Sequence, residues 1–238
     1  MNAFIYSVIL QWKLDLRNKG VLITYYIVPL IFFGFMGSIF SSINPQSKDT
    51  LIQSMSIFSI TMGAVLGSPA PLVALYGSEI KKSYKASNIP LYIPAVCNFI
   101  SSFINLLIVS IIIFFVAQFA FHAPAPLNIH IYLLVLVAFI IVSLSIGTLL
   151  GLMVKNPSKI AVVSQLIFLP SLMLSGIMFP TNLLPKAFET VGNVFPATHA
   201  MKIMTSDTTN IEMFLPLIII FLVMIMLSAF KLSKITIE

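Results

Sequence analysis

The sequence predicts an all-α integral membrane protein with six transmembrane helices, and its composition is the first reason. Of the 238 residues, 59% are hydrophobic and only 8% are charged, whereas a soluble domain carries about 25% charged residues. The mean hydropathy is +1.06. The apolar runs lack the alternation of barrel strands, so the spans are expected to be helices, which satisfy their own backbone groups in lipid.

The number of spans follows from the length of the apolar runs. About 20 helical residues are needed to cross about 30 Å of hydrocarbon. Six runs meet this requirement, near residues 21–43, 51–76, 93–120, 130–154, 158–178 and 211–231. We therefore expect one transmembrane domain over residues 1–238, with both termini on the same side of the membrane.

The basic residues indicate which side that is. Of the 13 lysines and arginines, all except Lys48, Lys186 and Lys202 fall in the N-terminal segment, the second and fourth connections or the C-terminal tail. By the positive-inside rule these parts are cytoplasmic. The formal charge of +6 is then a topology signal, and a nucleic-acid surface is not expected. We predict a multi-pass protein of the plasma membrane with the lipid bilayer as one partner.

The segment before the first span, residues 1–20, has an amphipathic pattern. Apolar residues including Trp12 alternate at helical spacing with Lys13 and Arg17. This pattern is typical of a helix that lies in the headgroup layer with an interfacial tryptophan. We expect an interfacial helix here.

The connection between spans two and three, residues 77–90, is polar and helix-compatible up to the residue before Pro90. Lys81 and Lys85 lie on one helical face. Two interpretations stay open: the segment docks on another protein, or its lysines serve topology alone.

A half-polar segment, residues 179–210, precedes the last span. Leu184, Phe188, Val191 and Phe195 form one apolar stripe at helical spacing, and Pro180, Pro185 and Pro196 divide the chain into short pieces. A seventh crossing is disfavoured by the charged residues within it. We expect short external helices that re-enter the outer leaflet, or else an interfacial loop that only caps the bundle.

The apolar cores of the six runs contain no charged residue, so an ion-coupled carrier has no obvious relay. No Gly-Lys dipeptide exists, which excludes a P-loop, and no metal-ligand or nucleophile pattern is present. Uncharged polar residues such as Asn105 either join helices or line a path. Gly63/Gly67 and Gly147/Gly151 allow close helix contact, and Pro69 and Pro71 are expected to kink span two. Energy for any transport has to come from a partner.

Two motifs carry a family resemblance. The stretch "LSGIMFPTNLLP", Leu174 to Pro185, is followed by Phe195-Pro196, and the second connection contains Glu79, Lys85 and Ile89-Pro90. Together with the order of spans, they resemble the membrane subunit of ABC transporters of the type 2 exporter class. The chain departs from the family pattern at Lys81-Lys82, where Gly-Thr is usual, and at Ile89, where threonine is common.

The resemblance implies a permease without enzymatic activity of its own, paired with a second permease as a homo- or heterodimer. Cytoplasmic ABC nucleotide-binding subunits hold ATP and magnesium, and this chain needs no cofactor. Spans two and five line the dimer axis. The residues expected to act are the coupling residues Glu79, Ile80, Lys81, Lys82, Ser83, Tyr84 and Lys85, and the external gate Gly176, Phe179, Pro180, Phe195 and Pro196.

The expected cargo is an amphipathic or lipophilic molecule such as a drug, an antimicrobial or toxin peptide or a lipid-linked compound, because the path offers no charge. Two alternatives stay open: a polysaccharide-type exporter permease, and a channel or carrier that works without ATP.

Overall fold

The computed structural model describes residues 3–43, 45–77, 84, 86–87, 89–178, 185–206 and 210–237. Within these residues the protein is helical and has no strand. Six helical stretches are long and apolar enough to cross a membrane: Lys19–Ile39, Lys48–Tyr76, Tyr92–Phe121, Ile129–Met153, Pro157–Leu174 and Ile211–Ile235. The all-α membrane fold with six spans is thereby confirmed.

The first two spans are composite. Span one consists of α2 (Lys19–Leu22), the π-helical turn η1 (Ile23–Ile27) and α3 (Val28–Ile43). Span two consists of the 3-10 helix η2 (Pro45–Thr50), α4 (Leu51–Met62), the π-helical turn η3 (Gly63–Gly67) and α5 (Pro69–Tyr76). The later spans are α7 (Tyr92–Phe121), α8 (Ile129–Met153), α9 (Pro157–Leu174) and, after the 3-10 helix η5 (Ile211–Phe214), α12 (Leu215–Ile237).

Each π turn ends two residues before a proline. The N–H of Val28 bonds the carbonyl of Ile23, five residues back, and Pro29 follows. In the same way the N–H of Ser68 bonds the carbonyl of Gly63, and Pro69 follows. A proline ring collides with the carbonyl four residues before it, and a wider turn relieves that collision without ending the helix.

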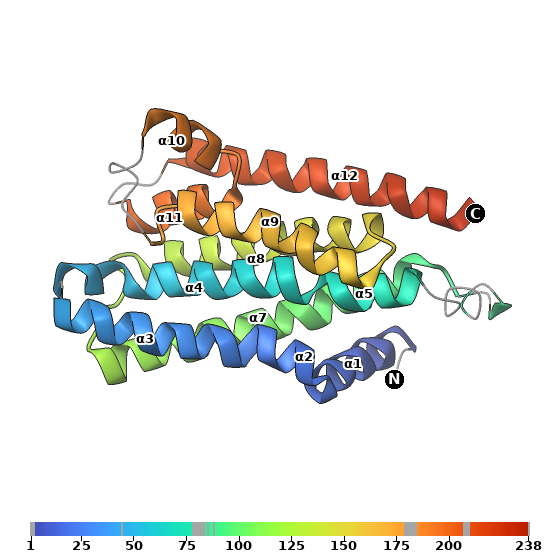
Figure 1. Cartoon of the computed structure of the whole chain (residues 1–238), viewed down its shortest axis with the longest axis horizontal. Helices are drawn as coiled ribbons and strands as arrows, with labels where there is room; N and C mark the ends of the chain where they lie inside the picture. Colours follow the sequence, from blue (N-terminus) through green and yellow to red (C-terminus); the bar gives the residue numbers. More distant parts are fainter. Residues whose placement is uncertain are drawn as a thin grey trace.

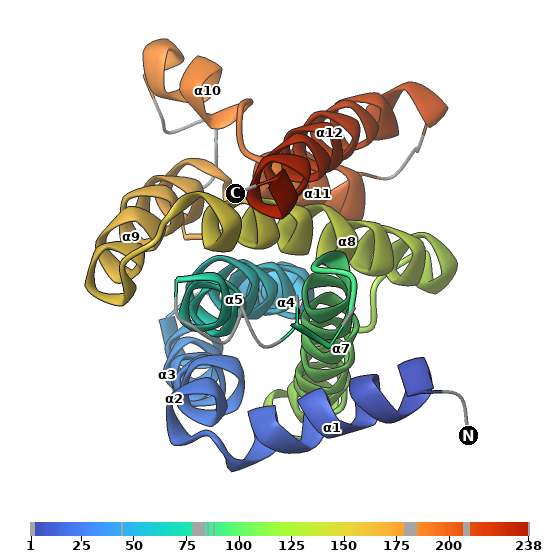
Figure 2. The same ribbon diagram turned by 90° about the vertical axis from the view of Figure 1, so that its right-hand side faces the viewer.

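Span two lies at the centre of the bundle (Figure 2). All twelve residues of α4 are buried. The glycine pairs explain how closely its neighbours approach. A Cβ on Gly147 of α8 would overlap the carbonyl oxygen of Ala64, and Gly63 lies against the ring of Tyr25 from span one. The two pairs therefore do serve helix packing.

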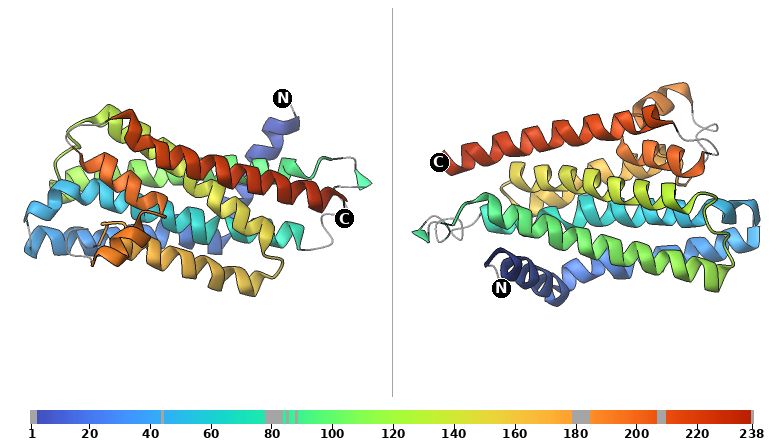
Figure 3. Two further views of the ribbon diagram at one scale, coloured as in Figure 1. Left: turned by 90° about the horizontal axis from the view of Figure 1, so that it is seen from above. Right: turned by 180° about the vertical axis from the view of Figure 1, so that it is seen from behind.

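Three shorter helices complete the structure: α1 (Ala3–Arg17), α10 (Lys186–Gly192) and α11 (Pro196–Thr205). Both chain ends lie at one end of the bundle, which we call the terminal end, together with α1, the end of α5 and the connection from α8 to α9 (Figures 1 and 3). The connection from α3 to α4, with α10 and α11, lies at the opposite, distal end.

Candidate functional site

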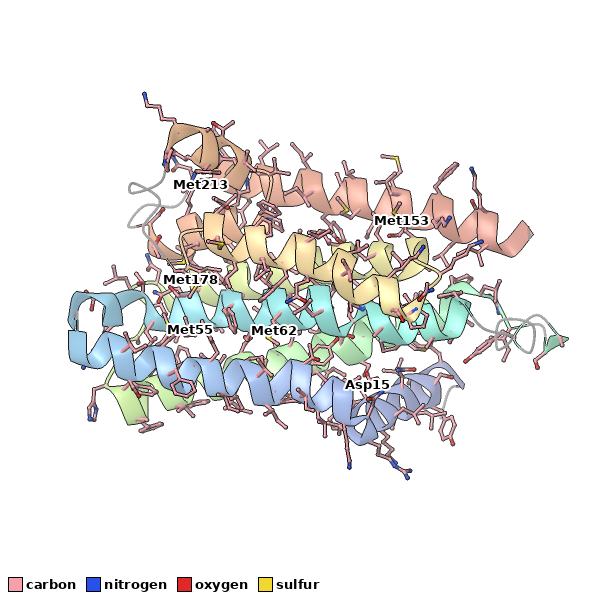
Figure 4. All side chains as sticks on the ribbon, viewed as in Figure 1. Asp15, Met55, Met62, Met153, Met178 and Met213 are labelled. Carbon is pink, nitrogen blue, oxygen red and sulfur yellow. The ribbon has the colours of Figure 1, made fainter. Side chains whose placement is uncertain are left out.

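At the terminal end, α1 packs its polar side against α7 and leaves apolar side chains such as Phe4, Ile9 and Leu14 exposed. Asp15 is the centre of this contact and is 4% exposed (Figure 4). One carboxylate oxygen accepts a hydrogen bond from Gln11 Nε2 at 2.9 Å, and the other accepts a short one from the Ser101 hydroxyl of α7. Within the described part of the chain, Asp15 forms no ion pair.

Burial raises the pKa of Asp15, and the hydrogen bonds from Ser101 and Gln11 offset this only in part. Removing a carboxylate from water disfavours its charged form when no cation is near. Docking of α1 therefore shifts the protonation equilibrium of Asp15 toward the neutral acid.

A second polar contact fixes α1 to α7. Trp12 Nε1 donates to Asn105 Oδ1 at 3.0 Å, and the hydroxyl of Tyr26 donates to the same oxygen at 2.9 Å. The indole nitrogen of Trp12 thus faces α7, and the interfacial position of α1 stays a prediction. Lys13 and Arg17 are exposed. Asn105 joins helices, which is the first of the two roles the sequence left open for the polar residues.

The residues at the two ends of the connection from α5 to α7 pack in an apolar cluster at the terminal end. Tyr76 donates its hydroxyl to the carbonyl of Leu91, which closes the connection. Tyr84 packs against the cluster, whose buried members are Leu72, Tyr76, Leu91, Ala95, Leu152 and Ile235. These residues come from α5, α7, α8 and α12. A displacement of the two ends of the connection therefore acts on four spanning helices. Of the expected coupling residues, Glu79, Ile80, Lys81, Lys82, Ser83 and Lys85 lie outside the described residues.

A cavity of about 310 Å³ lies between α1 and the end of this connection. Leu10, Gln11 and Leu14 line it from α1, and Tyr84, Ser87 and Ile89 line it from the connection. The helix that the sequence predicts before span one and the connection between spans two and three therefore meet at one cavity.

At the distal end, α9 ends at Leu174 and the chain turns at Gly176, whose φ of 83° is left-handed. Glycine reaches this conformation without the steric cost of a side chain. Phe179 and Pro180, two of the expected gate residues, lie outside the described residues.

Phe195 and Pro196, the other gate residues, begin α11. Thr198 Oγ1 donates to the carbonyl of Gly192, and Lys202 Nζ donates to Asn193 Oδ1 at 2.9 Å, so the corner between α10 and α11 is tied. The predicted single stripe through Phe195 is wrong, because α10 ends at Gly192 and Pro196 starts a new helix.

The side of α11 that faces the bundle is buried, and Met201 lies against the hydroxyl of Ser54 in α4. Phe188 and Val191 of α10 are exposed instead. Of the two helices, α11 is therefore the one that can transmit a movement to the centre of the bundle.

The interior of the bundle carries little charge. Asp15 is the only charged side chain among the buried ones that the structure describes, and no group of metal-ligating residues occurs within the described residues. The sequence missed Asp15 as an inward-facing residue, although its position four residues after Gln11 on α1 was the available signal.

Spans two and five differ in what they offer to a second subunit. The distal half of span two, α4, is enclosed, whereas α5 in the terminal half exposes Ala70 and Ala74. In span five, one stripe of α9 is exposed, consisting of Val162, Leu166, Leu169 and Met173. That spans two and five line a dimer axis stays a prediction.

Comparison with known proteins agrees with this architecture. A stretch of 96 residues, 40% of the chain, is 30% identical to ABC transporter G family member 20 of Dictyostelium discoideum, of which it covers only 13%. The family model for ABC-2 type transporters matches residues 2–208. Because that match takes in most of the six-span bundle, the chain belongs to the ABC-2 type transporter family as a multi-pass membrane permease component.

Proposed function

We propose that the protein is the permease subunit of an ATP-driven exporter. A separate nucleotide-binding subunit, which holds ATP and magnesium, binds the terminal end and drives its conformational change. The observation that carries the proposal is the cavity between α1 and the connection from α5 to α7. It brings together two segments that are each fixed to the bundle, one through Asp15 and Asn105 and the other through Tyr76.

In this proposal a partner that engages both segments moves them as one unit. The movement of α1 is transmitted to α7 through the hydrogen bonds of Asp15 and Trp12. The movement of the connection is transmitted to α8 and α12 through the apolar cluster. Residues 79–85 supply the docking face, and Glu79 and Lys85 are the two of its charged residues that the test addresses. The terminal end is cytoplasmic, as the distribution of lysines and arginines favours.

The cargo is proposed to be amphipathic or lipophilic. Buried side chains of the described bundle are apolar or uncharged apart from Asp15, and a strongly charged cargo would lack counter-charges within it. The exposed stripe on α9 is the proposed contact with a second permease subunit, and α11 is the proposed moving part of the external gate.

The experiment is transport by the reconstituted complex. The permease is purified with its ATPase in liposomes, and ligand-stimulated ATP hydrolysis and cargo flux are measured for wild type, Glu79→Ala, Lys85→Ala and the control Lys159→Ala. Lys159 is an exposed lysine at the same end, in the first turn of α9. Both coupling variants are expected to lose stimulated hydrolysis and flux while the control keeps both.

Unchanged flux in both coupling variants contradicts the coupling assignment. Flux through liposomes that contain only this chain and no nucleotide contradicts the proposal as a whole and supports a channel or carrier. Stimulation by a polysaccharide and not by amphipathic compounds moves the cargo to the polysaccharide class.

A further inference from the structure

A second cavity, at the distal end, has the properties of a ligand site. Its volume is about 380 Å³, within the range of about 300 to 1,000 Å³ typical of small-molecule pockets. Three parts of the chain enclose it: the start of span two, the connection from α7 to α8 with the first turn of α8, and the end of α11. No residue of this cavity lies in the contacts described above for α1.

Gln53 supplies an unsatisfied polar atom in the wall of this cavity. The side chain is 4% exposed, and its Oε1 atom has no hydrogen-bond partner. Leaving a buried acceptor unpaired costs about 1 to 3 kcal/mol, and buried polar atoms in folded proteins are as a rule paired. A ligand with a hydrogen-bond donor would supply the missing partner.

The charge of the lining selects the kind of donor. Among the described residues, Asp49 is the only charged one that lines the cavity. Its side chain is exposed and, within the described part of the chain, forms no ion pair. Lys48, its neighbour in sequence, does not line the cavity. The described lining therefore offers a carboxylate and an amide oxygen, together with the neutral polar residues Thr50, Asn128, Thr205 and Ser206, and includes no basic group.

The rest of the wall is largely apolar. Pro124, Pro126 and Leu127 line it from the connection, Ile131 from α8, and Ile203 and Met204 from α11. Tyr132 also lines it, but its hydroxyl is paired with Ser56 at 2.9 Å. An apolar body would be covered by this wall while a donor group faces Gln53 and Asp49.

We propose that the distal cavity binds a small amphipathic cation, a molecule with one ammonium group on an apolar body. The ammonium donates to Gln53 Oε1 and lies near the Asp49 carboxylate. Such a ligand also bridges α11 to α4 and α8, so its binding holds α11 against the bundle. The inference does not rest on the proposed export function, because binding requires neither ATP nor a partner.

Binding is tested on the purified full chain in lipid nanodiscs with dansylcadaverine, which carries one ammonium group on a fluorescent naphthalene. N-butyl dansylamide, which has the same body without the charge, is the neutral control. Fluorescence anisotropy is measured after subtraction of the signal from empty nanodiscs. Dansylcadaverine is expected to bind at least about tenfold more tightly than the neutral control, since hydrogen bonds from charged donors are the stronger ones.

Three variants locate the site. Gln53→Leu is expected to weaken dansylcadaverine binding about tenfold without lowering the melting temperature, because leucine fills a similar volume and removes the unpaired atom. Asp49→Asn is expected to weaken it about threefold, as suits an exposed carboxylate. Glu212→Gln is the matched control, since Glu212 is an exposed carboxylate in η5 that does not line the cavity.

The inference is overturned if the neutral control binds as tightly as the cation, which would mean an apolar site or simple partitioning. It is equally overturned if Gln53→Leu and Asp49→Asn bind like wild type, or if Glu212→Gln weakens binding as much as Asp49→Asn. Loss of transport in the coupling variants leaves it untouched, so this inference and the proposed function fail separately.

Discussion

The indole nitrogen of Trp12 and the side-chain oxygen of Asn105 lie 3.0 Å apart and join the N-terminal helix α1 to α7 across 93 residues of sequence. Trp12 is the single tryptophan of the chain. Its fluorescence therefore reports on the docking of α1 without any label.

Asn105→Leu is expected to loosen α1. The variant removes an acceptor shared by the half-buried side chains of Trp12 and Tyr26, and each lost hydrogen bond costs about 0.5 to 1.5 kcal/mol. Acrylamide quenching of tryptophan fluorescence should increase. Asn98→Leu is the control on the same helix, because the Asn98 side chain donates to the carbonyl of Ser68 in span two. Equal quenching in both variants would contradict the role of Asn105.

The docking of α1 is expected to weaken as pH rises. The pKa of Asp15 is raised by burial, so the docked state holds a proton that the undocked state releases. The contribution of the neutral acid is complete below the ordinary aspartate pKa and is lost as pH passes upward through the raised value. Quenching of Trp12 should therefore increase across a titration from about pH 4 to about pH 8.

Asp15→Asn is the test of that pH dependence. Asparagine keeps an oxygen for Gln11 or Ser101 and cannot ionise, so its quenching curve should be flat over the same titration. A curve that still follows the wild type would assign the transition to another group.

Gly147→Ala is expected to destabilise the bundle by about 1 to 3 kcal/mol, the usual cost of overpacking. The added methyl would overlap the carbonyl oxygen of Ala64 in span two. Gly34→Ala is the matched control, since a Cβ at Gly34 meets no atom within 4 Å. Thermal unfolding in detergent should show a lower midpoint for Gly147→Ala alone.

Gly176→Ala is expected to cost about 1 to 2 kcal/mol, because its φ of 83° is unfavourable for a residue with a Cβ. His122, with a φ of 52°, provides the converse test. His122→Gly should leave the melting midpoint unchanged or raise it. A midpoint that falls in both variants would show that side-chain contacts, and not the backbone, decide stability at these turns.

The six spans could be predicted from the sequence because an apolar helix of about 20 residues has the length of the hydrocarbon core. The close contacts of Gly147 with Ala64 were also within reach, since a small residue at helical spacing is the known condition for such packing. The side of α1 that faces the bundle could not be predicted. Its apolar stripe suggested that the opposite side meets water, but Asp15 and Trp12 find partners in Ser101 and Asn105, which only the folded chain brings near.

The region before the last span shows the same limit. The spacing of Phe188, Val191 and Phe195 fits one helix, yet Pro196 restarts the chain and turns α11 toward Ser54. The Gln53 cavity also escaped sequence reasoning, because its wall comes from three parts of the chain that are distant in sequence. Hydropathy ranks residues by their preference for lipid and does not show which of them line the same cavity.

The two π turns change the directions in which the side chains of spans one and two point around the helix axis. A π turn holds one residue more than a regular turn, and one residue corresponds to about 100° around the axis. Beyond Ile27 and Gly67 the side chains are thus rotated relative to an uninterrupted α-helix. The ring of Tyr25, inside the first π turn, lies against Gly63 and Gly67 of the second. Deleting one residue from Ile23–Ile27 would restore regular winding and leave the distal half of span one at its present azimuth, because the deleted residue is the extra one that the wide turn accommodates.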